Sequence, residues 1–444
     1  MEMSADLVLQ TAVIGLCLAV VALLLNRLRS TKEENVQRKP EKKEKKVDHH
    51  QAAKPAASKK KQEKWASRDS KAFTHPWMLT SLKGHTGEVL DMDFSGNSKF
   101  LATCADDRTV LLWNSKHLDQ KDNKSLRVNV EYDHATMVRW SPDSKAFIIH
   151  KGVENVVEVH KVVKKADGWI GSTSKAITFG KAHTDDVVGM DIAVNGRFIM
   201  TCSEKTDLVL WDLKGERLAT LDTLTMQTHR ARVSPCGHFI AASGFTPDVK
   251  VWEVVFTKSG EFDRVVRAFE LKGHSSGVFD FAFSSDSSRM ATISKDGNWR
   301  VFNTKIEYQK GEEPRLLQSG KHAPAAGAAT KSHLALAPDG ESFAVTTGSD
   351  LHLYVVSSGK LLATIKDLYG GPINCVRIDS TGQLVLTAGD RHVRVLHNMA
   401  HYMATAEVCA AKLKESGLSA ATKERLSELV ASSKAFLDKH SVTY

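Results

Sequence analysis

The feature that most constrains the fold of this chain is an internal repeat that begins near residue 73. Strand-like runs recur at intervals of roughly 40 to 50 residues, and each ends in an aromatic or aliphatic side chain. These end positions are Trp113, Val159, Trp211, Trp252, Phe302, Tyr354 and Leu396. A period of about 40 to 45 residues with insertions is typical of the four-stranded blade of a β-propeller. The repeat therefore predicts an all-β fold built from seven such units.

Each unit has the same internal order, which is clearest in the first. Lys83-Gly84-His85 come first, followed by residues 89–94, where polar and apolar side chains alternate, and then by the segment FLATCADDRTVLLWN. Alternation with a period of two indicates a strand with one buried face. The fifth unit repeats this order from Lys272-Gly273-His274 onward. Three strands joined by turns are thus visible within a unit.

These residues resemble the WD-repeat family, and the third unit even ends in Trp211-Asp212. The resemblance covers roughly residues 74–398 and implies a seven-bladed WD-repeat β-propeller. It also implies a buried chain of hydrogen bonds within a blade, through a His, a Ser or Thr, an Asp and a Trp. On this sequence the chain maps onto His85, Thr103, Asp107 and Trp113 in the first unit, His183, Thr201 and Trp211 in the third, and His274, Thr292 and Asp296 in the fifth.

Two of these networks are expected to be incomplete, and the ring is expected to close through its first strand. In the third unit Lys205 stands where the Asp is expected, and in the fifth Phe302 replaces the Trp and removes its indole donor. The second, fourth, sixth and seventh units lack the Gly-His pair but keep the hairpin turn. The seventh unit also ends without a fourth strand, while residues 73–82 form a strand-like piece outside the repeats. Closure by this piece predicts a propeller over residues 73–398.

The amino-terminal residues predict a transmembrane anchor. Residues 7–25 (LVLQTAVIGLCLAVVALLL) carry no charged side chain, and as a helix they nearly span the ~30 Å hydrocarbon core of a bilayer. A cleaved signal peptide is the rival interpretation, but such peptides begin with basic residues, whereas Glu2 and Asp6 precede this segment. Basic residues follow it, beginning with Arg27. The positive-inside rule then predicts lumenal residues 1–6 and a cytosolic propeller.

Residues 26–72 predict a disordered, lysine-rich linker. Their basic excess equals the formal net charge of the whole chain, +9, so the repeats themselves are close to neutral. Few large apolar side chains are present to offset the entropy that ordering would cost. The basic clusters are Lys42, Lys43, Lys45, Lys46, Lys59, Lys60 and Lys61. Contact with anionic lipid, contact with RNA and a solvated spacer are the three open interpretations.

Residues 399–444 predict a helical hairpin. Gly417 is the expected end of a first helix, and Ser419 or Thr422 is the expected N-cap of a second. An apolar stripe on the second helix is formed by Leu426, Leu429, Val430 and Leu437. The stripe favours docking on the propeller rim, with a partner-binding helix as the alternative.

The usual catalytic and cofactor-binding signatures are absent from the sequence. It has no phosphate-binding loop, dinucleotide fingerprint, zinc-protease motif or nucleophile elbow. Its six cysteines are too widely spaced for a disulfide framework or a zinc site, and Asp185-Asp186 has no matching base. We therefore expect a non-catalytic scaffold without cofactor, metal or small-molecule substrate. Protein partners are expected at the rim, where Arg108, Arg391 and Arg394 are basic candidates, although the sequence does not identify the binding surface.

The order of anchor, linker, propeller and helical tail resembles one membrane-bound branch of the WD-repeat family. That resemblance implies residence in the endoplasmic reticulum membrane and an adaptor role in the unfolded-protein response. It also implies a stress-response kinase and the translation machinery as partners. Two alternatives stay open. One is an RNA-binding protein that uses the linker or the rim; the other is a substrate receptor of a ubiquitin ligase, suggested by Trp211-Asp212-Leu213-Lys214.

Overall fold

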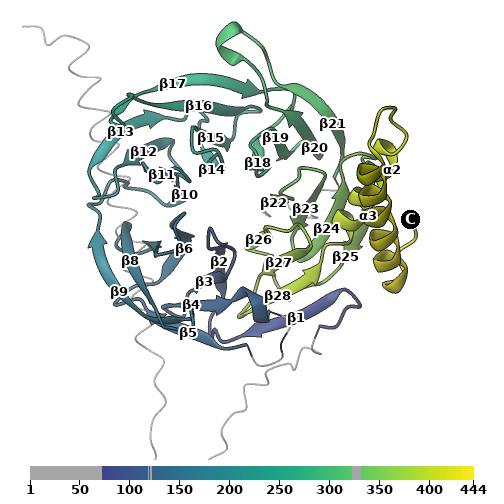
Figure 1. Ribbon diagram of the computed structural model, residues 1–444. Helices are drawn as coiled ribbons and strands as arrows, with labels where there is room; N and C mark the ends of the chain where they lie inside the picture. The colour runs from purple at the N-terminus through teal and green to yellow at the C-terminus, as the bar shows by residue number, and fades with distance from the viewer. Residues whose placement is uncertain (1–72, 119, 121–122, 323–331) are drawn as a thin grey trace, which may run out of the picture. The chain divides into compact units, whose positions relative to one another are not determined.

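The computed structural model describes residues 73–118, 120, 123–322 and 332–444, and these form a seven-bladed propeller with a pair of helices at its edge (Figure 1). Each blade is a four-stranded antiparallel sheet whose first strand lies nearest the central axis. The predicted all-β propeller with seven blades and a carboxyl-terminal helical pair is confirmed.

Six blades consist of four strands that follow one another in the sequence. Blade 1 contains β2 (Val89–Phe94), β3 (Phe100–Ala105), β4 (Thr109–Asn114) and β5 (Ser125–Asn129). Blade 2 contains β6 (Ala135–Trp140), β7 (Ala146–Lys151), β8 (Val156–Lys164) and β9 (Ile170–Thr178). Blade 3 contains β10 (Val187–Ile192), β11 (Ile199–Ser203), β12 (Asp207–Trp211) and β13 (Arg217–Asp222).

The next three blades follow the same plan. Blade 4 contains β14 (Thr228–Val233), β15 (Phe239–Gly244), β16 (Val249–Phe256) and β17 (Phe262–Leu271). Blade 5 contains β18 (Val278–Phe283), β19 (Arg289–Ser294), β20 (Asn298–Asn303) and β21 (Arg315–Lys321). Blade 6 contains β22 (His333–Leu336), β23 (Ser342–Thr347), β24 (Asp350–Val355) and β25 (Leu361–Ile365). Two short 3₁₀ helices are η1 (Ser115–His117) and η2 (Tyr308–Lys310).

Blade 7 is composite, because its fourth strand comes from the other end of the chain. It contains β26 (Cys375–Ile378), β27 (Leu384–Ala388), β28 (His392–His397) and β1 (Met78–Lys83). Strand β1 pairs antiparallel with β28, with Met78 opposite Leu396 and Lys83 opposite His392. The expected closure of the ring by an amino-terminal strand is therefore confirmed. Closure removes the open edge that β28 would otherwise expose.

Packing on both faces explains why the inner strands read as continuous apolar or small residues. All six residues of β3 (FLATCA) are buried, because this strand is covered by a neighbouring blade on each side. The fourth strands form the circumference and are mostly exposed; β9, for example, buries only Ile170. We call the face that carries the loops leading into the first strands, such as residues 84–88, the top face. The opposite face, with the turns between first and second strands, is the bottom face.

The bottom-face turns share one backbone feature. Their fourth residue has a positive φ, between 55° and 80°, in all seven blades: Ser98, Ser144, Gly196, Gly237, Ser287, Gly340 and Gly382. Glycine adopts this conformation freely, whereas an L side chain is disfavoured there by roughly 1–2 kcal/mol. Serine at three of these turns is thus a local conflict between sequence and backbone.

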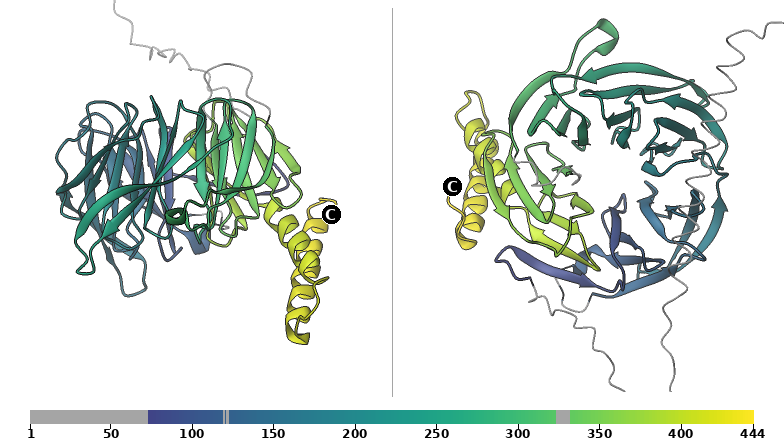
Figure 2. Two further views of the ribbon diagram at one scale, coloured as in Figure 1. Left: turned by 90° about the horizontal axis from the view of Figure 1, so that it is seen from above. Right: turned by 180° about the vertical axis from the view of Figure 1, so that it is seen from behind.

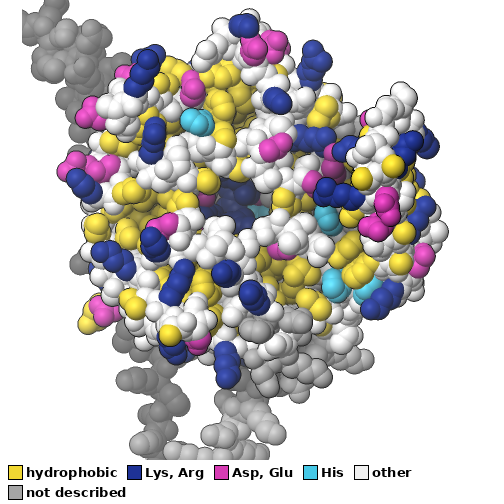
Figure 3. Space-filling view, viewed as in Figure 1, with side chains coloured by type: hydrophobic (Ala, Val, Ile, Leu, Met, Phe, Trp, Pro, Cys, Tyr) yellow, Lys and Arg dark blue, Asp and Glu magenta, His cyan; other side chains and the backbone are white. Residues whose placement is uncertain are grey.

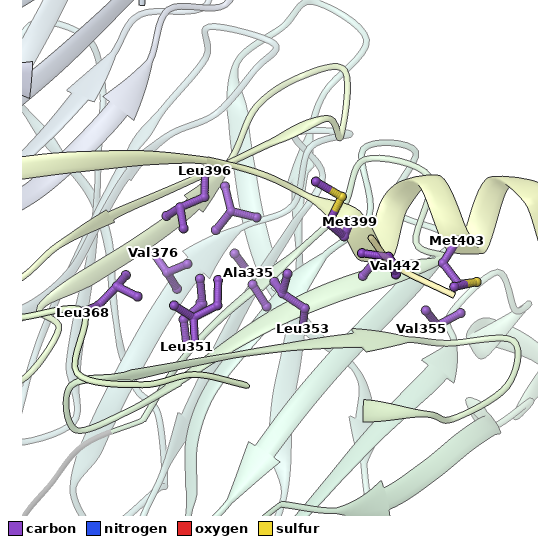
Figure 4. Close-up of a cluster of buried hydrophobic side chains, with 14 of the residues drawn as sticks. Ala335, Leu351, Leu353, Val355, Leu368, Val376, Leu396, Met399, Met403 and Val442 are labelled. Atoms are coloured by element: carbon purple, nitrogen blue, oxygen red, sulfur yellow. The ribbon is translucent and has the colours of Figure 1, made fainter. Parts of the chain in front are cut away.

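The helical pair docks on blades 6 and 7. Helix α2 (Met399–Lys412) buries Met399, Ala400 and Met403 against the sheet, and α3 (Ala420–Lys439) packs mainly on α2. Figure 4 shows Met399, Met403 and Val442 meeting Leu353, Val355 and Leu396 of the two blades. In Figure 2 the pair extends beyond one face of the disc.

The N-cap of the second helix lies where the sequence places it, but the expected end of the first helix is wrong: α2 ends at Lys412 with Leu413 as its C-cap, and Gly417 lies in the turn that follows. The Ser419 hydroxyl accepts a hydrogen bond from the Thr422 N–H at 3.2 Å, and Gly417 has φ +93°. Leu437 is buried, but Leu429 is exposed. The carboxyl-terminal end also contacts the start of β1, since the Trp77 indole donates to the His440 carbonyl oxygen at 3.4 Å.

The anchor expected at residues 7–25 and the linker expected at residues 26–72, with its lysines at positions 42–61, lie outside the described residues. Neither of the two α-helices in the described part of the chain is long and apolar enough to cross a membrane.

Replacing Ser98 by glycine should raise the free energy of unfolding by about 0.5–1 kcal/mol, because it removes the left-handed strain. Ser144→Gly is the matched comparison: the Ser144 hydroxyl also accepts the Asn97 N–H at 3.1 Å across the blade boundary, and losing that bond should cancel the gain. Urea unfolding of both variants measures the difference. Equal gains would show that the inter-blade bond contributes nothing.

Candidate functional site: networks, channel and rim of the propeller

The hydrogen-bond network of blade 1 joins all four residues that the sequence singled out. The Trp113 indole donates to the Thr103 hydroxyl at 3.0 Å, and Thr103 Oγ1 lies 2.8 Å from His85 Nε2. His85 Nδ1 lies 3.2 Å from Asp107 Oδ2. Burial lowers the pKa of His85 although Asp107 opposes the shift, so the ring is neutral at pH 7. A neutral ring donates from Nδ1 to the carboxylate and accepts the Thr103 proton at Nε2.

In blade 3 the expectation of a missing acid is wrong. His183 Nε2 lies 2.7 Å from Thr201 Oγ1, and the Trp211 indole donates to the same hydroxyl at 2.8 Å. The acid that bonds His183 Nδ1 is Asp207, which stands two positions after Lys205 and also accepts the Ser203 hydroxyl. Lys205 instead pairs with Asp185 at 2.8 Å on the surface. The family pattern places the acid at a fixed spacing, so it did not predict that Asp207, the first residue of β12, takes this role.

Blade 5 lacks the indole, as its sequence predicts. His274 bonds Thr292 at 2.8 Å and Asp296 at 3.1 Å, while Phe302 is buried in the place of the Trp. Trp299 in the same strand is also buried, but its indole nitrogen has no hydrogen-bond partner among the described residues. It therefore does not replace the missing donor.

Sequence reasoning missed further networks, among them those in blades 6 and 7. The Tyr369 hydroxyl donates to the Thr387 carbonyl oxygen at 2.5 Å and lies 3.1 Å from its hydroxyl. In blade 6, His322 bonds the Tyr354 hydroxyl at 3.0 Å and also Thr347. A signal was present for Tyr369, which precedes Thr387 by 18 positions, the same separation that joins His85 to Thr103, His183 to Thr201 and His274 to Thr292.

The corrected blade 3 network can be tested by substitution. Asp207→Ala should lower the free energy of unfolding by about 1–3 kcal/mol, because it leaves His183 and the Ser203 hydroxyl without their acceptor. Lys205→Ala should cost less than about 0.5 kcal/mol, since it removes only an exposed ion pair. Urea unfolding of the two variants compares them, and a larger loss for Lys205→Ala would refute the assignment of Asp207.

Acidic side chains on the first strands of blades 1, 3 and 5 bond these blades to their successors around the central channel. Asp93 accepts the Trp140 N–H at 2.8 Å, Asp191 accepts the Val233 N–H at 3.0 Å, and Asp280 accepts the Leu334 N–H at 3.0 Å. Asp91 accepts the Val138 N–H at 3.3 Å. Each bond runs from the side chain of one blade to the backbone of its successor. The carboxylates therefore fix the angle between blades where the strands come closest to the axis.

The same carboxylates pair with arginines in the channel. Arg139 bridges Asp91 and Asp191, and Arg377 reaches Asp91 at 3.2 Å from blade 7. Arg232 reaches Asp280 at 2.9 Å, and Arg230 lies 3.6 Å from it. Figure 3 shows Lys and Arg side chains gathered at the centre of the disc. The positive charges of these arginines offset the negative charges of the carboxylates that bond the neighbouring blade. The charged side chains of the channel therefore join the blades.

Two aspartates on one strand titrate in opposite directions. Burial alone would raise the pKa of Asp91, but Arg139, Arg377 and Arg230 outweigh it and lower the pKa to about 2. For Asp93, burial prevails over the pull of Arg139 and Arg377, and the pKa rises to about 6. Burial also lowers the pKa of His333 to about 4, with Arg230 adding to the shift. The fold thus stabilises the ionised form of Asp91 and, compared with a free aspartate, the protonated form of Asp93.

These shifts predict a contrast between two conservative substitutions. Asp91→Asn should lower the free energy of unfolding at pH 7.5 by about 2 kcal/mol or more, because it removes the charge that Arg139 and Arg377 share. Asp93→Asn should be neutral or stabilising, because the amide oxygen still accepts the Trp140 N–H and no charge is buried. Since the pKa of Asp93 is higher folded than unfolded, its protonation adds stability as the pH falls through about 6. Urea titrations at pH 7.5 and 5.5 should show that Asp93→Asn loses this increment.

The remaining sequence candidates fall into structural and exposed classes. Arg394 is fixed over the Tyr369 ring, 4.0 Å from its centre, and donates to the Leu368 carbonyl oxygen. Arg108 and Arg391 are exposed on the top face. Within the described ranges, no group of three or more His, Cys, Asp or Glu side chains has the geometry to hold a metal ion.

Comparison with known proteins agrees with this architecture. The family model described as "WD domain, G-beta repeat" matches residues 77–114, 174–212, 265–303 and 359–396. Each range covers the first three strands of blade 1, 3, 5 or 7 and residues of the outer strand of the blade before it. Transducin beta-like protein 2 of Homo sapiens is 46% identical over 356 residues, covering 80% of this chain and 79% of that protein. The protein of the same name from Mus musculus is 44% identical over 357 residues, covering 80% of each chain. Nuclear distribution protein PAC1 of Arthroderma benhamiae is 24% identical over 264 residues, which is 54% of this chain and 56% of its own.

The repeats, the composite blade and the His-Thr-Asp-Trp networks define a WD-repeat propeller protein. Within that class, the identity and coverage show that the chain belongs to the transducin beta-like protein 2 family. Membership supports a protein-binding scaffold as its general function, since WD-repeat propellers are typically non-catalytic platforms.

Proposed function

We propose that this chain is a membrane-tethered adaptor that holds cytosolic proteins at the surface of the endoplasmic reticulum. The apolar residues 7–25, with basic residues after them, support the tether. The layout that resembles a membrane-bound branch of the family supports a role in the unfolded-protein response and translation control, with a stress-response kinase and the translation machinery as partners. The propeller is the part that binds them.

The observation that carries the adaptor proposal is a set of large apolar side chains exposed on the top face of blades 2 and 4. Tyr132 is 92% exposed and Met226 is 76% exposed. Their neighbours Val153, Leu224 and Phe245 are also exposed. Exposed apolar groups gathered on a folded surface are characteristic of protein-interaction sites.

The backbone holds several of these side chains outward at a cost. Tyr132, Leu224 and Met226 have φ of 57°, 54° and 64°, a conformation that disfavours L side chains by roughly 1–2 kcal/mol each. In blade 4 the two loops are bonded, with the Phe245 N–H donating to the Gln227 carbonyl oxygen at 2.9 Å. Strain that surrounding structure maintains at an exposed position is a mark of a functional surface.

The blades that expose apolar side chains are also among those that depart from the family's His-Thr-Asp pattern. Blades 1, 3 and 5 use their top loops for the His network, and their acids there bond His85, His183 and His274. Blades 2 and 4 lack that network and present apolar side chains from the equivalent loops. The divergent blades therefore supply the proposed contact surface, on loops that other bonds hold in place.

The double substitution Met226→Ser/Phe245→Ser should reduce the binding of at least one cytosolic partner by about tenfold or more, because exposed aromatic and Met anchors dominate such interfaces. Leu316→Ser/Leu361→Ser is the matched control, since these leucines are 46% and 48% exposed on the outer strands of blades 5 and 6. Proximity labelling and co-purification of the full chain from cells compare the two. Partner sets that are unchanged by the top-face pair would contradict a contact surface on blades 2 and 4.

The tether has its own test. Protease treatment of intact microsomes should digest the propeller, and the sequon at Asn123-Lys124-Ser125 should remain unglycosylated in cells. Deleting residues 1–30 should release the protein from membranes and remove partners that depend on tethering. A glycosylated Asn123 would place the propeller in the lumen and end the proposal of cytosolic partners.

Two alternatives receive less support. RNA binding would use the lysine-rich linker or Arg108 and Arg391, and crosslinking to RNA should then weaken steeply with salt. A ubiquitin-ligase receptor was suggested by residues 211–214, but Asp212 closes a turn by accepting the N–H groups of Lys214 and Glu216 at 2.9 and 2.7 Å. Ligase association that survives Lys214→Ala would remove this alternative.

A further inference from the structure

The bottom-face turns of neighbouring blades are bonded to each other at several junctions. Asn97 N–H donates to the Ser144 hydroxyl between blades 1 and 2, and the Asn195 amide donates to the Gly237 carbonyl oxygen between blades 3 and 4. Further bonds of this kind are Cys236 N–H to the Ser287 hydroxyl at 3.0 Å and Ser285 N–H to the Pro338 carbonyl oxygen at 2.9 Å. Among the described residues, no such bond joins the turns of blades 6 and 7, of blades 7 and 1, or of blades 2 and 3.

At the junction of blades 2 and 3 a groove opens between the two turns. Its volume is about 450 Å³, within the range of sites that take a ligand or a peptide side chain. Ile148 and Ile199 form a buried floor, and Val159 and Ile192 form half-buried walls. The corresponding pocket between blades 7 and 1 is smaller, about 210 Å³, and includes Lys116 and Asp379. The blade 2–3 groove is therefore both larger and more apolar.

The rim of the groove carries apolar side chains that the fold does not need. Val194 is 57% exposed and Leu213 is 50% exposed. Val194 stands at the second position of its turn, where the other blades have Gly96, Pro142, Pro235, Ser285, Pro338 and Ser380. A branched aliphatic residue at this position adds apolar area to the mouth without burying it, which favours a partner that covers it.

The groove also has a charge preference. Asp143 is the charged residue among those that line it, and the Ser141 hydroxyl, which donates to it at 2.6 Å, lowers its pKa. Its nearest cation is Lys145, 3.9 Å away, with both side chains largely exposed, so that pair contributes little. A carboxylate beside apolar walls, whose one ion pair among the described residues is exposed and weak, complements a cation next to aliphatic side chains.

We propose that the groove between blades 2 and 3 binds a short linear segment of a partner protein, with aliphatic or aromatic side chains seated on Val194, Leu213, Ile148 and Ile199 and a Lys or Arg paired with Asp143. This inference rests on the proposed adaptor function and adds a second contact surface, on the face opposite Met226 and Phe245. The recognised feature is an apolar pair next to a cation, which distinguishes this site from the uncharged apolar residues of the top face.

A random twelve-residue peptide library displayed on phage, panned against the full chain in detergent micelles, tests the site. Selected peptides should be enriched in an aliphatic or aromatic pair near a Lys or Arg. Fluorescence polarisation of the best peptide should show binding weakened about tenfold or more by Val194→Ser/Leu213→Ser and changed less than about twofold by Leu316→Ser/Leu361→Ser. Thermal melting of each variant checks that it remains folded.

Asp143→Asn is the second variant, because its amide oxygen can keep the bonds from Ser141 and Lys145. It should weaken the cationic peptide about three- to tenfold but leave the same peptide with Lys or Arg replaced by Ala unchanged. Peptides selected without the pattern, or binding that survives Val194→Ser/Leu213→Ser, would overturn the proposal. Sedimentation of the wild-type chain and of Val194→Ser/Leu213→Ser compares their oligomeric states. A wild-type dimer that becomes a monomer in the variant would assign the groove to a second copy of the chain and would also overturn the proposal.

The two proposals fail separately. If cytosolic partners bind the full chain but their binding and peptide binding are both indifferent to Val194, Leu213 and Asp143, the adaptor stands and the groove is excluded. If no cytosolic protein depends on the propeller in the wild-type chain, the adaptor proposal fails whatever the peptides show.

Discussion

The antiparallel pairing of β1 with β28 completes blade 7 and so closes the ring of blades. Seven sheets can press against one another only if each has a neighbour on both sides, which requires blade 7 to meet blade 1. The ion pair between Arg377 of blade 7 and Asp91 of blade 1 lies across this closure. Asp91 in turn shares Arg139 with Asp191. The ion pairs that link blades 7, 1, 2 and 3 in the channel therefore include the junction at which the ring closes.

The buried histidines, aspartates and arginines described above are bonded in pairs and chains. The imidazoles of blades 1, 3 and 5 have an acceptor on one side and a hydroxyl on the other, which avoids the penalty of an unsatisfied group. The channel arginines meet carboxylates that also bond the backbone. These groups therefore stabilise the ring, and the adaptor proposal rests on the exposed surface instead.

Much of the fold was predictable from the sequence, because repetition multiplies a weak signal. One strand-like run such as residues 89–94 is ambiguous, but recurrence at a blade-like period indicated both the fold and the closure by β1. The acid of blade 3 was not predictable, because a carboxylate two positions away reaches the same imidazole once β12 has formed. Tyr369 was missed for a related reason: a phenol hydroxyl stands where the family pattern has an imidazole and bonds the Thr at the same separation. The candidate surfaces could not be read at all, since exposure of Met226 or Val194 depends on neighbours that are distant in the sequence.

The docking of the helical pair has a mechanical consequence. Trp77, just before β1, is bonded to His440, and Val442 packs in the same cluster as the end of β28. A pull on the residues that precede β1 would therefore be resisted first by the carboxyl-terminal helices and only then by the strand pairing that closes the ring. The two ends of the folded region thus hold each other in place. A force applied at the amino-terminal end is shared by the carboxyl-terminal helices before the propeller can open.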